Sequence, residues 1–426
     1  MSTPRDNGAL APLRVRTYRF QWLADLGTSW AFEMEVLILG WYVLVETQSV
    51  LMLTVFASLQ HLGTLVAPMF GLAGDKLGHR NVLCIMRAYY AMLALSMMTL
   101  AFSGVLQPLH VFIIAALTGL VRSSDLVMRA TLVGATLPAP LWMRAMSISR
   151  TTMDTARITG ALVGAGVAAT RGMGPAYVVV ACMYISSFLF TLQVEGGRRP
   201  APPSPIDKAD KAVRTSHWQE LKAGFAHVWN TPQLLGVMWL AFMVNFMGFP
   251  LVNGLLPYVA KEIHGTGQPG LALLVASSAT GALLGSIVLT RLGRLFPAAR
   301  MMLISSIAWY LLLMTFAQMS HPWAGMSVLV FSGFTQSLTM VLMSVVILRI
   351  TEERFRGRVT GIRMFAIYGL PIGLLAAGPL ITHIGYAAMA AIYCSIGVLS
   401  SVVIALRWRR ELWSADAPAN AFAGRA

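Results

Sequence analysis

Long apolar stretches follow one another along nearly the whole chain, and only short polar turns separate them. Each stretch is long enough for a membrane-spanning helix, which needs about 20 apolar residues. A transmembrane β-barrel would instead show segments of about ten residues in which apolar and polar positions alternate. The pattern therefore predicts an all-α membrane protein with twelve transmembrane helices. We expect these helices at residues 18–45, 51–73, 82–103, 109–134, 145–170, 175–196, 234–260, 269–290, 301–320, 323–348, 357–383 and 386–407.

Composition and charge placement support a membrane protein and indicate its orientation. Of the 426 residues, 57% are hydrophobic and 12% are charged, whereas roughly 25% are charged in typical soluble domains. The net charge is +15, but most Lys and Arg residues lie in the N-terminal segment, the even-numbered turns, the central linker and the C-terminal tail. Only Arg171 and Lys261 lie in odd-numbered loops. Because cytoplasmic loops collect basic residues, we expect both termini in the cytoplasm and no nucleic-acid partner.

Other classes of protein find little support in the sequence. The N-terminal arginines lead into a full-length apolar span without a small-residue cleavage site, so we expect an uncleaved first helix rather than a signal peptide. Cys84, Cys182 and Cys394 lie inside spans without Cys-x-x-Cys spacing, so we expect no metal site and no cofactor. Neither a nucleophile elbow nor a phosphate-binding loop is present, and this argues against an enzyme and against ATP-driven transport.

A polar, proline-rich stretch divides the chain into two parts that resemble each other. Arg150 matches Arg363 and Gly160 matches Gly373, at an offset of about 213 residues. Duplicated six-helix halves are typical of transporters, because rocking one repeat against the other exposes a site to either side. We expect an N-terminal half at residues 1–196, a cytoplasmic linker with an amphipathic helix at 197–233, and a C-terminal half with a short cytoplasmic tail at 234–426.

Three motifs carry a resemblance to a known family. The turn between helices two and three, from Gly71 to Arg80, reads GLAGDKLGHR. Residues 41–49 at the end of helix one read WYVLVETQS, and residues 356–361 at the start of helix eleven read RGRVTG. With these motifs the chain resembles the transporters of the major facilitator superfamily, and within it the branch of enterobactin-type siderophore exporters and macrolide efflux pumps. The resemblance covers nearly the whole chain and implies the major facilitator fold, with helices one and four lining a central cavity.

The chain departs from this family's antiporter motifs at three positions. Thr290 stands in the second-half copy of the turn motif where the first half has Asp75. Ala115 stands four residues before Gly119, where drug–proton antiporters have an arginine. In the helix-five motif, Ala161 stands where those antiporters have a proline. The familiar arrangement for proton antiport is therefore not reproduced.

Charged residues inside the spans are the candidates for substrate and proton binding, because each is costly unless it is paired or hydrated. On helix four, three of them at i, i+3 and i+7 share one face. Three on helix five, at i, i+4 and i+7, do the same. The candidates are Asp25, Glu33 and Glu35 on helix one, Arg122, Asp125 and Arg129 on helix four, Arg150, Asp154 and Arg157 on helix five, and Arg363 on helix eleven.

Two interpretations of these charges are open. In the functional one, Arg122 and Arg157 attract anionic groups of a substrate, and a helix-one carboxylate, with Glu33 favoured, carries the coupling proton. In the structural one, Asp125 and Asp154 neutralise the arginines as ion pairs. We favour the structural interpretation for Arg129 and Arg150, which lie nearest the cytoplasm and can extend toward water.

The turn motif supplies a separate set of candidates for gating. Asp75 can bind the N-terminal end of helix eleven, where two arginines and the positive end of the helix dipole lie, and so hold an outward-open state. The alternative is a turn that only fixes topology. The gating candidates are Asp75, Lys76, Gly78, Arg80, Arg356 and Arg358.

Together these features predict a secondary active transporter rather than an enzyme. We expect it to export a small organic molecule, a siderophore-like anion, across the cytoplasmic (inner) membrane by proton antiport with alternating access. A multidrug or macrolide efflux pump and an uptake system for a small organic anion are the alternatives, and a membrane sensor or scaffold without transport is a third. The expected partners are the small-molecule substrate, protons and the lipid bilayer, and we expect a monomer.

Overall fold

The computed structural model describes residues 10–64, 67–195, 225–292, 297–351 and 355–414, and within these ranges the chain is helical with no β-strand. Two compact units form: Met1–Ser204 with Thr266–Ala276, and Pro205–Gly265 with Ser277–Ala426. Most of the predicted linker at residues 197–233 lies outside the described residues. The predicted all-α class is confirmed.

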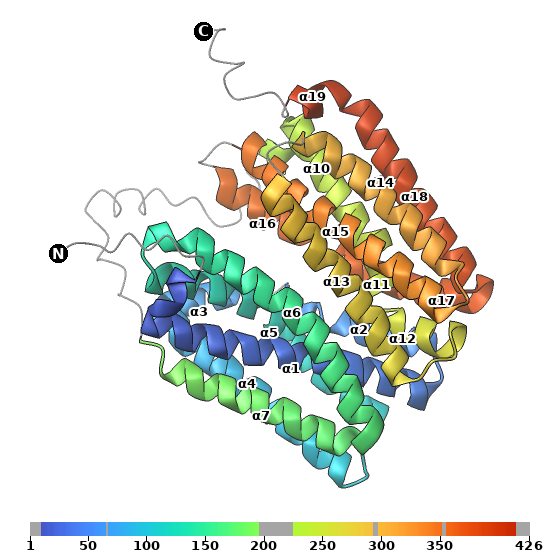
Figure 1. The fold of residues 1–426 in the computed structure, drawn as a ribbon. Helices are drawn as coiled ribbons and strands as arrows, with labels where there is room; N and C mark the ends of the chain where they lie inside the picture. The colour runs from blue at the N-terminus through green and yellow to red at the C-terminus, as the bar shows by residue number, and fades with distance from the viewer. Residues whose placement is uncertain (1–9, 65–66, 196–224, 293–296, 352–354, 415–426) are drawn as a thin grey trace, which may run out of the picture. The chain divides into compact units, whose positions relative to one another are not determined.

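In the first unit, α1 is the central helix, and it packs along α6 and α7 (Figure 1). α4 packs along α7, and α5 contacts α1, α2 and α4. A core of buried aliphatic and aromatic side chains holds these helices together. The elements are η1 (Ala11–Arg14), α1 (Arg16–Thr47), α2 (Val50–Leu59), η2 (Leu62–Thr64), α3 (Ala67–Leu77), α4 (His79–Phe102), α5 (Pro108–Thr136), α6 (Ala139–Arg171) and α7 (Met173–Leu192).

In the second unit, α14 packs against α15 and α18, and the segment from α10 to η4 contains two π-helical turns. The predicted helix eleven is interrupted between α16 and α17. The elements are α10 (Pro232–Met243), η3 (Val244–Gly248), α11 (Phe249–Asn253), α12 (Leu256–Tyr258), η4 (Val259–Ile263), α13 (Gln268–Leu292), α14 (Ala298–Ala317), α15 (Pro322–Ile350), α16 (Arg356–Ala366), α17 (Gly369–Ile384), α18 (Tyr386–Arg407) and α19 (Arg409–Ser414). The part of α13 up to Ala276 belongs to the first unit.

Ten helical segments of the described chain are long and apolar enough to cross a membrane, and two predicted spans differ from them. The second predicted span is broken into α2, η2 and α3, so no single helix of it has the full length. The fifth corresponds to α6, which has 33 residues but includes four arginines and an aspartate. Its length therefore suits a membrane span, but with these charges it is not among the ten helices that are apolar enough to cross a membrane.

Glycines allow the closest helix contacts in both units. In the first, a Cβ at Gly119 of α5 would lie 2.2 Å from the backbone oxygen of Leu59 on α2. In the second, a Cβ at Gly333 of α15 would lie 1.9 Å from the backbone oxygen of Ser278 on α13. Backbones this close leave no room for a side chain, so these two crossings require glycine.

Candidate functional site

A buried cluster of four charges joins three helices of the first unit. Asp25 of α1 forms an ion pair with Arg87 of α4, and its Oδ1 lies 3.6 Å from Nε of Arg129 on α5. Arg129 also pairs with Asp125 one turn earlier on its own helix. The Arg87 and Asp125 residues are fully buried, and the other two are less than a tenth exposed. Two acids and two bases thus neutralise one another away from water, as buried charges require.

Hydroxyl groups complete this cluster. Arg87 donates a hydrogen bond to Oγ1 of Thr191 at the end of α7, and Nη1 of Arg129 donates to Oγ of Ser29 at 3.0 Å. The sequence candidates included three of the four charges but omitted Arg87. The signal was present, because Arg87 is an ionisable residue inside the third predicted span. What the sequence could not show was that Asp25 pairs with it.

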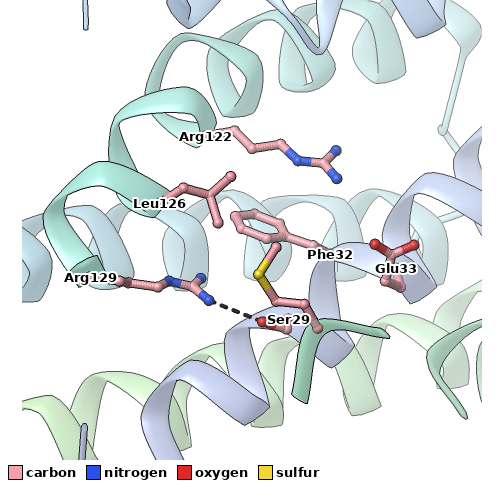
Figure 2. Close-up of a pocket in the computed structure, with 7 residues that line it drawn as sticks. Ser29, Phe32, Glu33, Arg122, Leu126 and Arg129 are labelled. Carbon is pink, nitrogen blue, oxygen red and sulfur yellow. Dashed lines mark hydrogen bonds between the residues drawn. The ribbon is translucent and has the colours of Figure 1, made fainter. Parts of the chain in front are cut away.

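A cavity of about 60 Å³ lies beside this cluster, between α1, α5 and α6. Figure 2 shows that Glu33, Phe32 and Arg122 reach into the same region. Within the described part of the chain, Glu33 forms no hydrogen bond and no ion pair, so its carboxylate has no direct partner in this cavity. The lining residues are Ser29, Phe32, Glu33, Arg122, Leu126, Arg129 and Met153.

Arg122 is held on two sides. Its Nη1 donates a hydrogen bond of 2.6 Å to Oε1 of Gln60, which follows α2 at the break in the second predicted span. Its guanidinium carbon lies 5.0 Å from the centre of the Phe32 ring, within the range of a cation–π interaction. Arg122 is not paired with Asp125, although the two share a helix face, because Asp125 pairs with Arg129.

A second cavity, of about 90 Å³, adjoins the first and shares four of its lining residues. Asp25 and Arg129 lie on its wall, together with Trp22 and Thr152, which are joined by a 2.9 Å hydrogen bond. The two cavities follow α1, α5 and α6, the helices predicted as one, four and five. The shared residues are Ser29, Leu126, Arg129 and Met153.

Glu35 lies elsewhere on α1, in a small aromatic enclosure. It is 6% exposed and accepts hydrogen bonds from the phenol groups of Tyr184, at 2.9 Å, and Tyr177, at 3.4 Å, both on α7. The tyrosines were not among the sequence candidates. A tyrosine inside an apolar helix does not differ in pattern from any other aromatic core residue, so only the fold reveals its carboxylate partner.

The remaining candidates lie outside the two cavities. Nε of Arg150 lies 3.2 Å from Oδ2 of Asp154, one turn apart on α6. Arg157 is on the same helix but is not among the lining residues of either cavity. In the second unit, Nη1 of Arg363 donates a 2.7 Å hydrogen bond to Oγ of Ser344 on α15.

The gating candidates are described only in part. Gly78 has a φ of +87° between α3 and α4, a conformation that favours glycine, and Lys76 is exposed. Arg80 donates to the backbone oxygen of Leu192 and so binds the C-terminal end of α7, where a cation is favoured. The side chains of Asp75, Arg356 and Arg358 lie outside the described residues.

Similarity to known proteins extends over most of the chain. Residues 28–270 and 238–422 match the family model described as Major Facilitator Superfamily. The multidrug efflux pump Tap of Mycolicibacterium fortuitum is 25% identical over 390 residues, which are 89% of this chain and 92% of that protein.

Solved structures share the fold. The nucleoside transporter NupG superposes with a TM-score of 0.69 at 15% identity, covering 92% of this chain and 99% of NupG. A POT family transporter in complex with 5-aminolevulinic acid superposes with a TM-score of 0.72 at 10% identity, covering 93% of this chain and 96% of that one.

Proposed function

The chain belongs to the major facilitator superfamily, and from that premise we propose that it exports small amphiphilic molecules from the cytoplasm in exchange for protons. It is a multi-pass membrane transporter rather than an enzyme, and it acts on small molecules. Its relative Tap is a multidrug efflux pump, and the match spans nearly the whole of both chains.

One observation carries the choice of substrate. Glu33 is the unpaired carboxylate in a cavity whose other walls include Phe32, Leu126 and Met153. Of the two arginines of the cavity, Arg129 is paired with Asp25 and Asp125, and Arg122 is held by a hydrogen bond to Gln60. A carboxylate among apolar and aromatic groups suits a lipophilic cation, which gains both charge pairing and apolar contact. Methionine adapts its shape to different ligands, so one cavity can accept several.

A siderophore-like anion is the second candidate, because both cavity arginines could rearrange toward an acidic ligand. Guanidinium groups bind carboxylate or catecholate oxygens through paired hydrogen bonds. In the second unit, the described partner of Arg363 is the neutral hydroxyl of Ser344, which leaves its charge available to an anion. Uptake of a small organic anion would use the same groups in the opposite direction.

The test uses the purified full chain in proteoliposomes with an imposed pH gradient. We expect proton-driven movement of tetraphenylphosphonium, a lipophilic cation, and we expect Glu33→Gln to abolish it. Glu46→Gln is the matched control, because Glu46 is an exposed carboxylate at the far end of the same helix. Dihydroxybenzoate, a catecholate, is the anionic probe. Transport of dihydroxybenzoate without tetraphenylphosphonium would replace the first candidate by the second.

The orientation proposed from the basic residues has its own test. Both termini and the central linker are placed in the cytoplasm of the inner membrane. Single cysteines introduced at Ser204 and Gln48 should react with a membrane-impermeant reagent from opposite sides. Reaction of both from one side would contradict the proposed topology.

A further inference from the structure

Two carboxylates of α1 occupy different surroundings although only one residue separates them. Successive helical residues are about 100° apart, so Glu33 and Glu35 point in nearly opposite directions. Glu33 faces the cavity, and its Cβ lies at α6, within 2.9 Å of where a Cβ of Gly160 would be. Glu35 faces α7 and is almost completely buried. One carboxylate is therefore accessible to a ligand, and the other is not.

Aromatic rings enclose Glu35. The ring of Tyr184, which donates to the carboxylate, lies 5.7 Å from the ring of Phe32 and 5.5 Å from that of Tyr90 on α4. Phe32 also lines the cavity that contains Glu33, so its ring stands between the two carboxylates. A substrate in the cavity would meet this ring before it reached Glu35.

A third and much smaller cavity reaches Glu35 from the side of α2 and α5. Its volume is about 10 Å³, which is near the space that one water molecule requires. Besides Glu35, polar groups of Gln60, Thr118 and Arg122 lie on its wall. The site admits a proton carrier of the size of water and excludes an organic molecule.

Arg122 belongs to both cavities. Its charge acts on Glu35, and Figure 2 shows its guanidinium turned toward the side of the larger cavity where Glu33 lies. The other titratable groups facing Glu35 are the two tyrosines of α7, while α2 contributes the neutral Gln60. Arg122 is thus the one described cation that can respond to both carboxylates.

We propose that Glu35 carries the coupling proton and Glu33 binds the substrate, so that proton and substrate occupy separate sites. This inference rests on the proposed proton-coupled export. Glu35 takes up one proton and becomes neutral, and the Tyr184 hydroxyl changes from donor to acceptor of a hydrogen bond. The charge of Glu35 then no longer attracts Arg122, which turns toward Glu33 and competes there with a bound cation. Proton binding and substrate binding thereby oppose each other, as exchange requires.

The experiment measures two activities of the full chain in proteoliposomes. One is counterflow of labelled tetraphenylphosphonium without a pH gradient, and the other is proton movement caused by adding tetraphenylphosphonium, followed with a pH-sensitive dye. We expect Glu35→Gln to lose proton movement while counterflow continues, and Glu33→Gln to lose both. Proton movement that persists in Glu35→Gln would overturn the assignment. Wild-type protein that moves tetraphenylphosphonium without protons would instead contradict the proposed proton coupling.

A tyrosine pair keeps the inference testable if Glu35→Gln does not fold. Tyr184→Phe removes a hydrogen bond to Glu35, and we expect it to shift the pH dependence of proton movement and that of counterflow together, because proton binding opposes substrate binding. Tyr90→Phe is the matched control, because the buried Tyr90 hydroxyl has no hydrogen-bond partner in the described structure. An equal shift in both variants, or in neither, would overturn the proton site at Glu35.

Discussion

The two halves pack equivalent helices in the same way and fill them with different chemistry. Gly119 of α5 lies against α2, and Gly333 of α15 lies against α13, each with backbone-to-backbone contact. The positions three, six and ten residues after these glycines follow the same helix face. The first half has Arg122, Asp125 and Arg129 there, whereas the second has Gln336, Thr339 and Met343.

A second pair of equivalent contacts shows the same difference. A Cβ at Gly160 of α6 would meet Glu33 of α1, and a Cβ at Gly373 of α17 would meet Phe246 of η3. The matching partner of the cavity carboxylate is therefore a phenylalanine, whose ring lies 5.6 Å from that of Phe242. The first half has charged side chains at positions where the second half has neutral polar or apolar ones.

The comparison of the two halves distinguishes what the helix crossings need from what the charged residues add. Since the second half achieves the same helix crossings without a charged cluster, the charges of the first half are not needed for the crossings themselves. Buried charges are costly to retain in a membrane. We infer that the first half supplies the ion and substrate chemistry and that the second supplies an apolar partner for the conformational change.

The largest expected effect is on the stability of the charged cluster. Arg87→Met leaves Asp25 with only the more distant Arg129, and removal of one partner of a buried ion pair costs about 3–5 kcal/mol. We expect a corresponding loss of thermal stability in detergent. Arg291→Met, at an exposed arginine of α13 in the second half, should change stability by less than about 0.5 kcal/mol.

The double variant of Asp25→Asn with Arg87→Met sharpens this test. Because the two side chains form one pair, their effects should not add, and the double variant should be less destabilised than the two single costs together. Simple additivity would contradict a direct interaction between them.

The glycine contacts should give intermediate effects, and the second half should be the more sensitive. At Gly373 an added Cβ would lie 2.1 Å from a backbone oxygen, that of Phe246, whereas at Gly160 it would meet the side-chain Cβ of Glu33 at 2.9 Å. Overpacking of this kind costs about 1–3 kcal/mol. Thermal unfolding of Gly373→Ala and Gly160→Ala should show the larger loss for Gly373→Ala, and the reverse order would contradict this steric argument.

The sequence predicted the helices well, because the length and continuity of apolar stretches reflect the membrane directly. It also marked the paired glycines Gly160 and Gly373 as equivalent. The break after α2 escaped it, since Gln60 and His61 are only a short polar interruption within a long apolar stretch. At that break the chain approaches α5 closely, because a Cβ at Gly63 would lie 2.3 Å from the backbone oxygen of Gly119.

The candidate site was predictable as a set of charges and not as a set of pairs. Helical spacing placed Asp125 within reach of both Arg122 and Arg129, and it could not decide between them. The choice depends on Gln60 and Asp25, which come from distant parts of the chain. Likewise, the sequence identified Glu33 and Glu35 as charges of one helix without showing which of them is enclosed.

Arg122→Gln makes the first half resemble the second, where Gln336 takes the equivalent position. We expect transport of tetraphenylphosphonium to continue, because Glu33 is retained. Its binding should no longer weaken as the pH falls, because the cation that competes for Glu33 is gone. Binding measured over a pH series tests this. Unchanged pH dependence would contradict this competition. Loss of dihydroxybenzoate transport would favour the anionic substrate instead.

The smallest effect is expected at Thr339, which stands where the first half has Asp125. Its hydroxyl lies 3.0 Å from Oγ of Ser305 on α14 and 2.9 Å from the backbone oxygen of Thr335. Thr339→Val removes these hydrogen bonds at little change in shape, which should cost about 0.5–1.5 kcal/mol. Ser305 retains its bond to the backbone oxygen of Met302, so no buried group is left wholly unpaired. Thermal unfolding and proton-driven transport should both be near those of the wild type. A loss as large as that of Arg87→Met would show that the neutral network of the second half is as critical as the ion pairs of the first.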